Sequence, residues 1–283
     1  MRLFCFGFGY SAQALALRLS ARDHTLAGTR TSLADDAPFP GLQLVAFAGD
    51  ARRLDVTAAL EGTTHLLVSI PPDLEGDVVL RLHREDVAGL PDLAWVGYLS
   101  TVGVYGDWQG RWVDETSPTR PTSERSLRRL QAEQAWASFG QETGRRVEIF
   151  RLSGIYGPGR SVIDSLRAGT ARRIVKPGQV FNRIHVDDIA RVLVAAIDRA
   201  TGHSIYNVSD DEPAPLQDVV AYAAELLGVP VPPEVAFAGA GLSGMAATFW
   251  AESKRVCNGR IRRELRADLL YPTYREGLRA LVS

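Results

Sequence analysis

The chain has 283 residues, of which 46% are hydrophobic and 23% charged, and its formal net charge is −1 at pH 7. This length can form one large or two smaller domains with a proper core. The nearly neutral charge argues against nucleic acid or a membrane surface as the main partner. Two cysteines, Cys5 and Cys257, make no disulfide framework, so we expect reduced thiols in a cytoplasmic protein. No apolar run approaches the ~18 residues of a membrane span, and the N-terminus does not resemble a signal peptide.

The first twenty residues have the pattern of a strand, a glycine turn and a helix. Residues 3–6 are an apolar run, residues 7–12 read G-x-G-x-x-A, and apolar residues then recur at helical spacing. In this context the pattern favours dinucleotide binding, because the glycines permit a tight turn and a close approach of backbone to a pyrophosphate. The helix N-terminus adds free N–H groups. The expected cofactor contacts are Gly7, Phe8, Gly9, Tyr10 and Ser11; the alternative is a glycine turn of an unrelated α/β protein.

Further apolar runs alternate with helical patterns along the chain. Strands are expected at 24–29, 42–47, 65–70, 93–99 and 147–152, and a helix over about 124–142. This alternation predicts an α/β fold with a doubly wound, Rossmann-like parallel sheet. Asp187 or Asp188 is expected to cap a helix, and residues 205–208 to form a strand. We therefore expect a dinucleotide-binding domain over 1–157 and a smaller C-terminal substrate lobe over 158–283, with 185–209 returning to the sheet and a loop over 229–244.

The end of the second predicted strand distinguishes NAD from NADP. An acidic residue at this place binds the ribose 2′-hydroxyl of NAD, but residues 28–31 read G-T-R-T. The guanidinium of Arg30 suits a 2′-phosphate, so NADP is favoured over NAD, with an exposed loop arginine as the alternative. Asp50 could accept a hydrogen bond from the adenine amine or cap the next helix. Ser69 and Pro71 lie at the carboxyl end of the fourth predicted strand, at the edge where such sheets bind ligands.

Several later stretches resemble the extended short-chain dehydrogenases, the NAD-dependent epimerase/dehydratase group. Residues 100–106 read S-T-V-G-V-Y-G and residues 151–160 read R-L-S-G-I-Y-G-P-G-R, followed by H-V-D-D at 185–188 and Y-N-V at 206–208. The C-terminal stretch 271–278 and the chain length resemble a small atypical branch that contains the YeeZ-like proteins. The resemblance implies an NAD(P)-binding oxidoreductase or epimerase with a small-molecule substrate, and a homodimer formed through the helix from Glu124.

The resemblance also points to the catalytic positions, with one departure. The family uses a Ser/Thr together with a Tyr-x-x-x-Lys pair, whose tyrosine is the acid/base. Thr101 matches the Ser/Thr, but counting back from the landmark Glu133 puts Arg125 at the tyrosine and Arg129 at the lysine. Arg125 cannot act as a general acid/base because arginine stays protonated, whereas Arg129 could still bind ribose hydroxyls or phosphate. Tyr105 could substitute as the acid; the alternative is the packing role that this tyrosine usually has in the family.

Substrate recognition departs from the family in a similar way. Its sugar-nucleotide enzymes often carry an arginine four residues before the histidine of H-V-D-D, where this chain has Phe181. Arg160 and Arg183 are expected to meet an anionic group, with structural salt bridges as the alternative. The scattered histidines show no metal-ligand spacing, so no metal is expected. Two functions stay open: an NADP-dependent oxidoreductase or epimerase without the Tyr-x-x-x-Lys pair, and a non-catalytic NADP(H)-binding sensor or scaffold.

Overall fold

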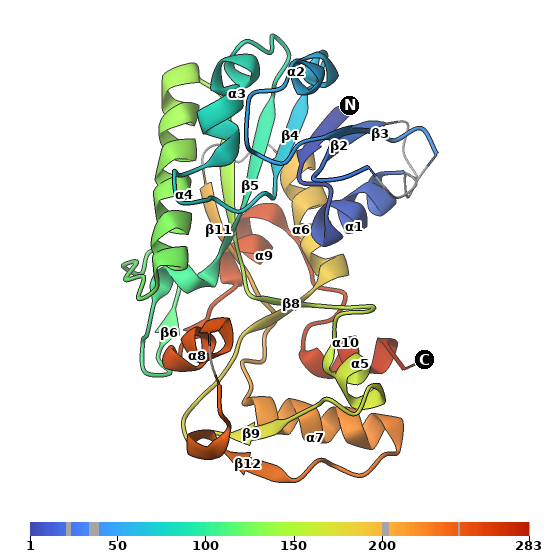
Figure 1. Cartoon of the computed structure of the whole chain (residues 1–283), viewed down its shortest axis with the longest axis vertical. Helices are drawn as coiled ribbons and strands as arrows, with labels where there is room; N and C mark the ends of the chain where they lie inside the picture. The colour runs from blue at the N-terminus through green and yellow to red at the C-terminus, as the bar shows by residue number, and fades with distance from the viewer. Residues whose placement is uncertain (21–23, 34–39, 200–203, 243, 283) are drawn as a thin grey trace.

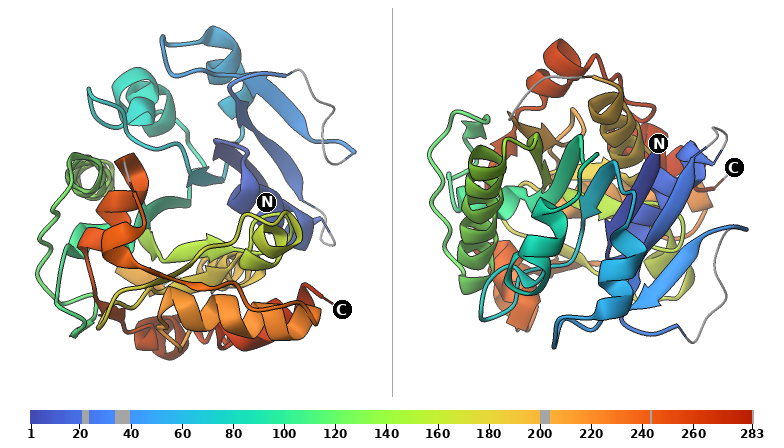
Figure 2. Two further views of the ribbon diagram at one scale, coloured as in Figure 1. Left: turned by 60° about the horizontal axis from the view of Figure 1, so that its bottom comes forward. Right: turned by 90° about the horizontal axis from the view of Figure 1, so that it is seen from above.

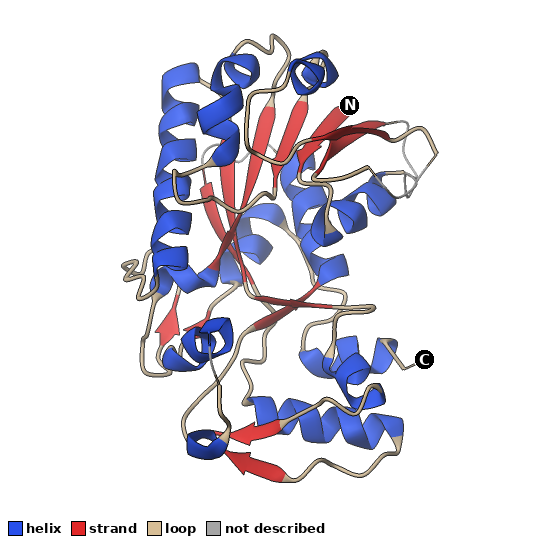
Figure 3. Cartoon of the chain, viewed as in Figure 1, coloured by secondary structure: helices blue, strands red, loops and turns tan. Residues whose placement is uncertain are grey.

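The computed structural model describes residues 1–20, 24–33, 40–199, 204–242 and 244–282. Its centre is a seven-stranded parallel sheet with the strand order β11-β7-β5-β4-β1-β2-β3 (Figure 3). These strands are β1 (Arg2–Phe6), β2 (Thr25–Arg30), β3 (Gln43–Ala46), β4 (His65–Val68), β5 (Trp95–Thr101), β7 (Val147–Leu152) and β11 (Ser204–Val208). The expected α/β fold with a doubly wound, Rossmann-like sheet is confirmed.

Helices cover both faces of this sheet (Figure 2). One face carries α1 (Tyr10–Leu19), α6 (Val186–Asp198) and α9 (Gly259–Leu265), and the other carries α2 (Leu54–Leu60), α3 (Val78–Ala88) and α4 (Glu124–Thr143). The strands accordingly send alternate side chains into two separate cores: in β1, Leu3 and Cys5 pack with the first set of helices, and Phe4 and Phe6 with the second. A strand buried on both faces is apolar throughout, which is why unbroken apolar runs indicated these strands.

A smaller lobe lies beyond the carboxyl end of β5 (Figure 1). Its helices are α5 (Val162–Arg167), α7 (Leu216–Leu227), α8 (Gly244–Ala251) and α10 (Tyr274–Ala280). Short parallel pairs link these helices: β8 (Gly154–Tyr156) with β10 (Arg183–His185), β9 (Arg173–Val175) with β12 (Glu234–Ala236), and β6 (Trp112–Val113) with β13 (Arg255–Val256). Two single-turn helices, η1 (Val102–Tyr105) and η2 (Phe237–Gly239), complete the elements. The chain crosses between the lobes repeatedly, because α6, β11 and α9 return to the large sheet.

Two local expectations are wrong. The residue that caps α6 is His185, and it is neither Asp187 nor Asp188. Its Nδ1 accepts a hydrogen bond from the backbone N–H of Asp187 at 3.2 Å. Asp188 is fully buried and accepts instead from the backbone N–H groups of Leu270 and Tyr271, so it fastens the C-terminal segment to α6. The stretch 229–244, expected as a loop, contains β12 and η2, because β12 finds a distant partner in β9.

Within the described ranges, none of the helices combines the length and the apolar character that crossing a membrane requires.

Candidate functional site

The glycine loop between β1 and α1 fits a dinucleotide. Gly7 has a φ of +85°, and a Cβ atom there would lie 2.8 Å from Ser69 Oγ, so this position requires glycine. Helix α1 begins after Gly9, and no side chain of the described residues caps it. A Cβ atom at Gly9 would meet no described atom within 4 Å. An uncapped helix N-terminus with open space beside it can receive a pyrophosphate.

Side chains from the two neighbouring strands hold this loop. Thr29 Oγ1, in β2, accepts a hydrogen bond from the backbone N–H of Gly7 at 2.9 Å. Ser69 Oγ, just after β4, donates to the carbonyl oxygen of Gly7 at 2.5 Å. Arg30, the last residue of β2, donates from Nε to the carbonyl oxygen of Phe8 at 3.5 Å, so its guanidinium lies beside the loop.

The two other predicted cofactor residues lie at the same edge of the sheet. Pro71 is exposed after β4, and Asp50 is exposed after β3. Asp50 accepts a hydrogen bond from the adjacent backbone N–H of Ala51. Helix α2 begins after Arg53, with no capping side chain among the described residues. The alternative that Asp50 caps α2 is therefore wrong, and its contact with the adenine stays a prediction.

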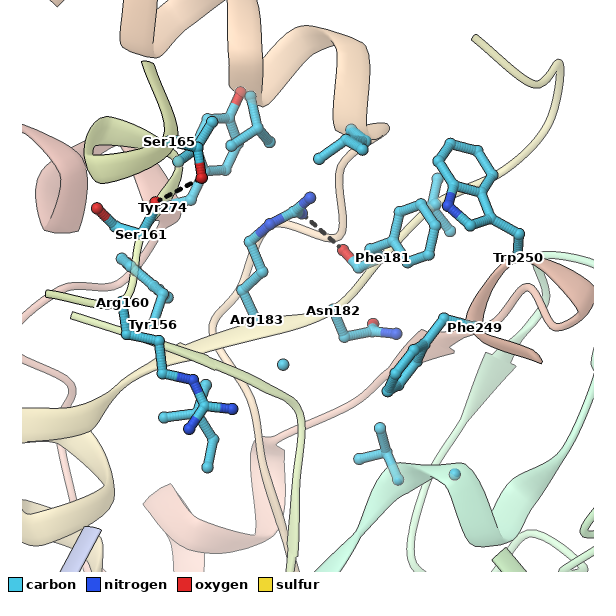
Figure 4. A pocket seen from close by; sticks show the side chains of 18 of the residues that line it. Tyr156, Arg160, Ser161, Ser165, Phe181, Asn182, Arg183, Phe249, Trp250 and Tyr274 are labelled. Carbon is cyan, nitrogen blue, oxygen red and sulfur yellow. Dashed lines mark hydrogen bonds between the residues drawn. The ribbon is translucent and has the colours of Figure 1, made fainter. Parts of the chain in front are cut away.

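A cavity of about 840 Å³ opens where β5 ends. Thr101 from β5 and Arg125 and Arg129 from α4 line one part of its wall. Arg160 and Arg183, which belong to the smaller lobe, line another (Figure 4). The structure thus brings three of the four predicted catalytic residues to one cavity with both predicted substrate residues.

The hydroxyl groups of Thr101 and Ser126 both lie near Gly103, the second residue of η1. A Cβ atom at residue 103 would lie 2.9 Å from Ser126 Oγ and 3.3 Å from Thr101 Oγ1, so glycine leaves room for both oxygens. Thr101 Oγ1 accepts from the backbone N–H of Gly103 at 3.1 Å and keeps its own hydrogen for another partner. Ser126 was not predicted, although it directly follows Arg125 and lines the same cavity.

The guanidinium of Arg129 is fixed to the end of β5. Its Nη1 donates to the carbonyl oxygen of Leu99 at 2.9 Å and to the hydroxyl of Tyr98 at 3.2 Å. The group also lies over the Tyr98 ring, 5.7 Å from its centre. Since arginine stays protonated, this arrangement keeps a permanent positive charge in the wall that also contains Thr101.

Tyr105 does not line the cavity, which corrects its expected role as a substitute acid. Its side chain is fully buried, and its hydroxyl donates to Asn207 Oδ1 at 2.8 Å and accepts from Arg151 Nη1 at 3.0 Å. Arg151 in turn forms a buried ion pair with Glu133 at 2.7 Å. Burial raises the pKa of Tyr105. The hydroxyl therefore joins η1, β7 and β11 in an internal network and cannot reach a substrate in the cavity.

The smaller lobe touches the glycine loop through the Y-G-P-G-R stretch. Tyr10, the first residue of α1, donates from its hydroxyl to the carbonyl oxygen of Pro158 at 3.0 Å. Arg160 lies over the Tyr10 ring, 5.8 Å from its centre. A Cβ atom at Gly157 would come within 2.5 Å of the Tyr10 hydroxyl, so glycine permits this close approach. The cofactor loop and the wall of the cavity are thus in direct contact.

Sequence reasoning missed the part of the wall formed by residues 248–254. Lys254, which is buried, donates from Nζ to the carbonyl oxygen of Gly106 at 2.7 Å and to Glu252 at 2.6 Å. Burial lowers the pKa of Lys254. Phe181 and Trp250 pack edge to face, with ring centres 4.9 Å apart. No spacing in the sequence connects this segment to Thr101; the pairing of β13 with β6 brings it there.

Two further expectations concern metals and disulfides. Within the part of the chain that the structure describes, no group of three or more His, Cys, Asp and Glu side chains could hold a metal ion. Cys5 and Cys257 are both free thiols, and Cys5 is buried in β1.

Comparison with known proteins shows which family the chain resembles. The model of the NAD dependent epimerase/dehydratase family matches residues 87–209. Protein YeeZ of Escherichia coli K12 is 27% identical over 212 residues, which are 71% of this chain and 75% of YeeZ. A functionally unknown conserved protein from Silicibacter pomeroyi is 45% identical, with a TM-score of 0.87 over 99% of this chain and 98% of its own. UDP-glucuronic acid 4-epimerase from Bacillus cereus, in complex with NAD, is 16% identical, and its TM-score of 0.81 over 100% of this chain and 96% of its own shows the shared fold. Over residues 87–209 the chain thus resembles the NAD-dependent epimerase/dehydratase family, and it is similar to YeeZ over most of its length.

Proposed function

We propose that this protein is an NADP(H)-dependent oxidoreductase or epimerase that acts on a small substrate in the 840 Å³ cavity. The observation that carries the proposal is the contact between the glycine loop and the cavity wall, made by Tyr10 with Pro158 and Arg160. The similarity of residues 87–209 to the NAD dependent epimerase/dehydratase family supports a nicotinamide dinucleotide as the cofactor. When bound, this cofactor supplies hydride transfer. A substrate in the cavity would then lie next to it.

The residues around Thr101 have the chemistry to hold a substrate oxygen. The hydroxyls of Thr101 and Ser126 are hydrogen-bond donors on the cavity wall, and Arg129 adds a fixed positive charge. Donors and charges that are already in place stabilise an oxygen as it becomes negative. Arginine cannot exchange a proton at working pH, so the proton must pass through another group. Lys254 lies on the same wall, and its lowered pKa favours release of a proton.

The preference for NADP rests on Arg30. The UDP-glucuronic acid 4-epimerase is in complex with NAD. In this chain β2 ends in Thr29 and Arg30, with no acidic side chain at that place to accept from a ribose 2′-hydroxyl. Arg30 lies beside the glycine loop, where its guanidinium can meet a 2′-phosphate with charge-assisted hydrogen bonds.

Isothermal titration with NADP⁺ and NAD⁺ tests this preference. The wild-type protein is expected to bind NADP⁺ more tightly. Arg30→Ala should weaken NADP⁺ binding roughly 10- to 100-fold, the loss of one charged hydrogen bond of about 1.5–3 kcal/mol, and leave NAD⁺ binding unchanged. Arg167→Ala, which removes an exposed arginine at the end of α5, is the matched control and should change neither. Equal binding of the two cofactors by the wild-type protein would contradict the preference.

The alternative is a non-catalytic NADP(H)-binding sensor or scaffold, and the arginines at positions 125 and 129 give it support. Without a tyrosine acid at Arg125, we expect little turnover of simple alcohols or of nucleotide sugars. The absorbance of the reduced nicotinamide measures turnover of alcohols and aldehydes, and chromatographic separation of UDP-glucose from its epimers measures epimerisation, which produces no net reduced cofactor. The double variant Arg125→Tyr/Arg129→Lys should raise the rate if the cavity is catalytic. Efficient wild-type turnover with a tyrosine-like pH profile would show that the active site lies elsewhere.

A further inference from the structure

We propose that the cavity selects a substrate with an aromatic or similarly apolar ring at one end and a single carboxylate at the other, in preference to a nucleoside diphosphate. This inference rests on the proposed function, because it names the substrate class of the same cavity. Three observations support it. One end of the cavity is apolar, the cations around that end already have hydrogen-bond partners, and the opposite end carries an exposed arginine.

The apolar end is built from aromatic side chains of α8 and of the segment before β10, together with Phe237 of η2. Trp250 packs edge to face with Phe181 and lies 5.4 Å from the ring centre of Phe237. Phe249, its neighbour in α8, lines the cavity and is 59% exposed. Figure 4 shows Phe181, Phe249 and Trp250 gathered on one side of the cavity in that view. An exposed phenyl ring beside other rings gains free energy when an apolar group covers it.

The cations near these rings already donate to backbone carbonyl groups. Arg183 Nη1 donates to the carbonyl oxygens of Phe181 and Ala214 at 3.0 and 3.1 Å, and Arg172 Nη2 donates to that of Ala240 at 2.7 Å. Lys176 Nζ donates to the carbonyl oxygen of Trp250. A diphosphate carries at least two negative charges and needs several such donors directed toward it. This end of the cavity therefore favours a ring over a diphosphate.

The opposite end carries positive charge that suits one carboxylate. Arg160 is exposed and held over the Tyr10 ring, and it lines the cavity near the glycine loop. A planar guanidinium pairs with a carboxylate through two parallel hydrogen bonds. In Figure 4, Arg160 lies on the other side of the cavity from Phe249 and Trp250. The cavity also has to hold the nicotinamide end of the cofactor, which leaves the substrate only part of the 840 Å³.

Titration of four probes into the NADP⁺-saturated protein tests the inference. The probe 3-phenylpropionate has both features, succinate lacks the ring, 3-phenylpropionamide lacks the charge, and UDP-glucose carries a diphosphate. We expect 3-phenylpropionate to bind at least tenfold more tightly than each of the others. Tighter binding of UDP-glucose, or equal binding of succinate and 3-phenylpropionate, overturns the inference.

Two variants of the cavity wall and one control variant test which end of the cavity binds the ring and which binds the carboxylate. Phe249→Ala should weaken binding of 3-phenylpropionate at least fivefold and leave the binding of succinate unchanged. Because Phe249 is exposed, this substitution leaves the core of the protein intact. Arg160→Ala should reduce the affinity for 3-phenylpropionate to that of the amide. Leu270→Ala removes an apolar side chain that is 48% exposed outside the cavity wall, and it should have no effect. Unchanged affinity in both cavity variants overturns the inference.

The proposed function and this inference can fail separately. NADP⁺ binding without preference for 3-phenylpropionate overturns the inference and leaves the proposed function standing. If NADP⁺ does not bind, the proposed function fails, and the same four titrations on the free protein decide the inference.

Discussion

At the residue scale, several polar side chains in the family-like stretches stabilise the fold and do not face the cavity. Glu133 and Arg151 form a buried ion pair that also holds Tyr105, and Asp188 binds two backbone N–H groups of the C-terminal segment. Removal of one partner of such a pair leaves an uncompensated buried charge, which costs about 3–5 kcal/mol. A motif in a sequence therefore indicates that a residue matters, and burial decides whether it contributes to stability or to chemistry.

His65, the first residue of β4, makes the stability of the protein depend on pH. Burial and the nearby charge of Arg146 lower the pKa of His65 from 6.5 to about 4. Between these values the unfolded chain binds a proton that the folded chain does not, so stability falls as the pH decreases from about 6.5 to about 4. We expect His65→Gln to lose part of this fall in urea unfolding experiments. At pH 7.5 the imidazole is neutral in the folded and the unfolded state, so this pH serves as the control. If the free energy of unfolding of His65→Gln falls in parallel with that of the wild type from pH 7.5 to 4.5, His65 is not the group responsible.

At the scale of secondary-structure elements, a strand or helix could be recognised from the sequence only where it is long and continuous. The central strands of the large sheet are buried on both faces and stand out as apolar runs, as in β5 and β7. The pairs in the smaller lobe involve strands of only two or three residues, such as β13 with β6. So short a strand has no periodicity to recognise, and β13 in addition lies more than a hundred residues from its partner β6.

The two glycines of the loop before α1 should respond differently to substitution. Gly7→Ala places a Cβ atom 2.8 Å from Ser69 Oγ at a positive φ, so we expect a loss of stability of about 1–3 kcal/mol. Gly9 has a φ of −94° and open space around its Cβ position. Gly9→Ala should therefore change stability by less than about 1 kcal/mol. It should still weaken NADP⁺ binding at least tenfold, because the methyl group occupies the space that the pyrophosphate needs.

Urea unfolding and isothermal titration of both variants separate these effects. Gly9→Ala is the sharper test of the cofactor site. Because its stability should be close to that of the wild type, a loss of NADP⁺ binding cannot be attributed to unfolding. A Gly9→Ala protein that binds NADP⁺ like the wild type would place the pyrophosphate away from this loop.

At the scale of the whole molecule, the candidate site is assembled from segments that are distant in the sequence. The glycine loop and Arg30 were predictable because they lie within one local β-α-β pattern. The residues of the smaller lobe were predictable only where a family motif marks them, as at Arg160 and Arg183. Lys254 and Trp250 carry no such mark, and tertiary packing alone brings them to the wall that contains Thr101.

The same packing should make the chain unfold as one unit. The core on the α1 side of the sheet contains Leu3 and Phe150 from the strands together with Ile261 and Leu265 from α9, so the C-terminal segment is part of the main core. We therefore expect a single thermal transition, with coincident changes in calorimetry and in far-UV circular dichroism. NADP⁺ at 100 times its dissociation constant adds about 2.7 kcal/mol of stability, which should raise the Tm of a chain of this length by roughly 4–5 °C. Because the cofactor loop contacts the smaller lobe through Tyr10 and Pro158, both signals should shift together. Two separate transitions, of which only one responds to NADP⁺, would show that the smaller lobe folds independently of the cofactor site.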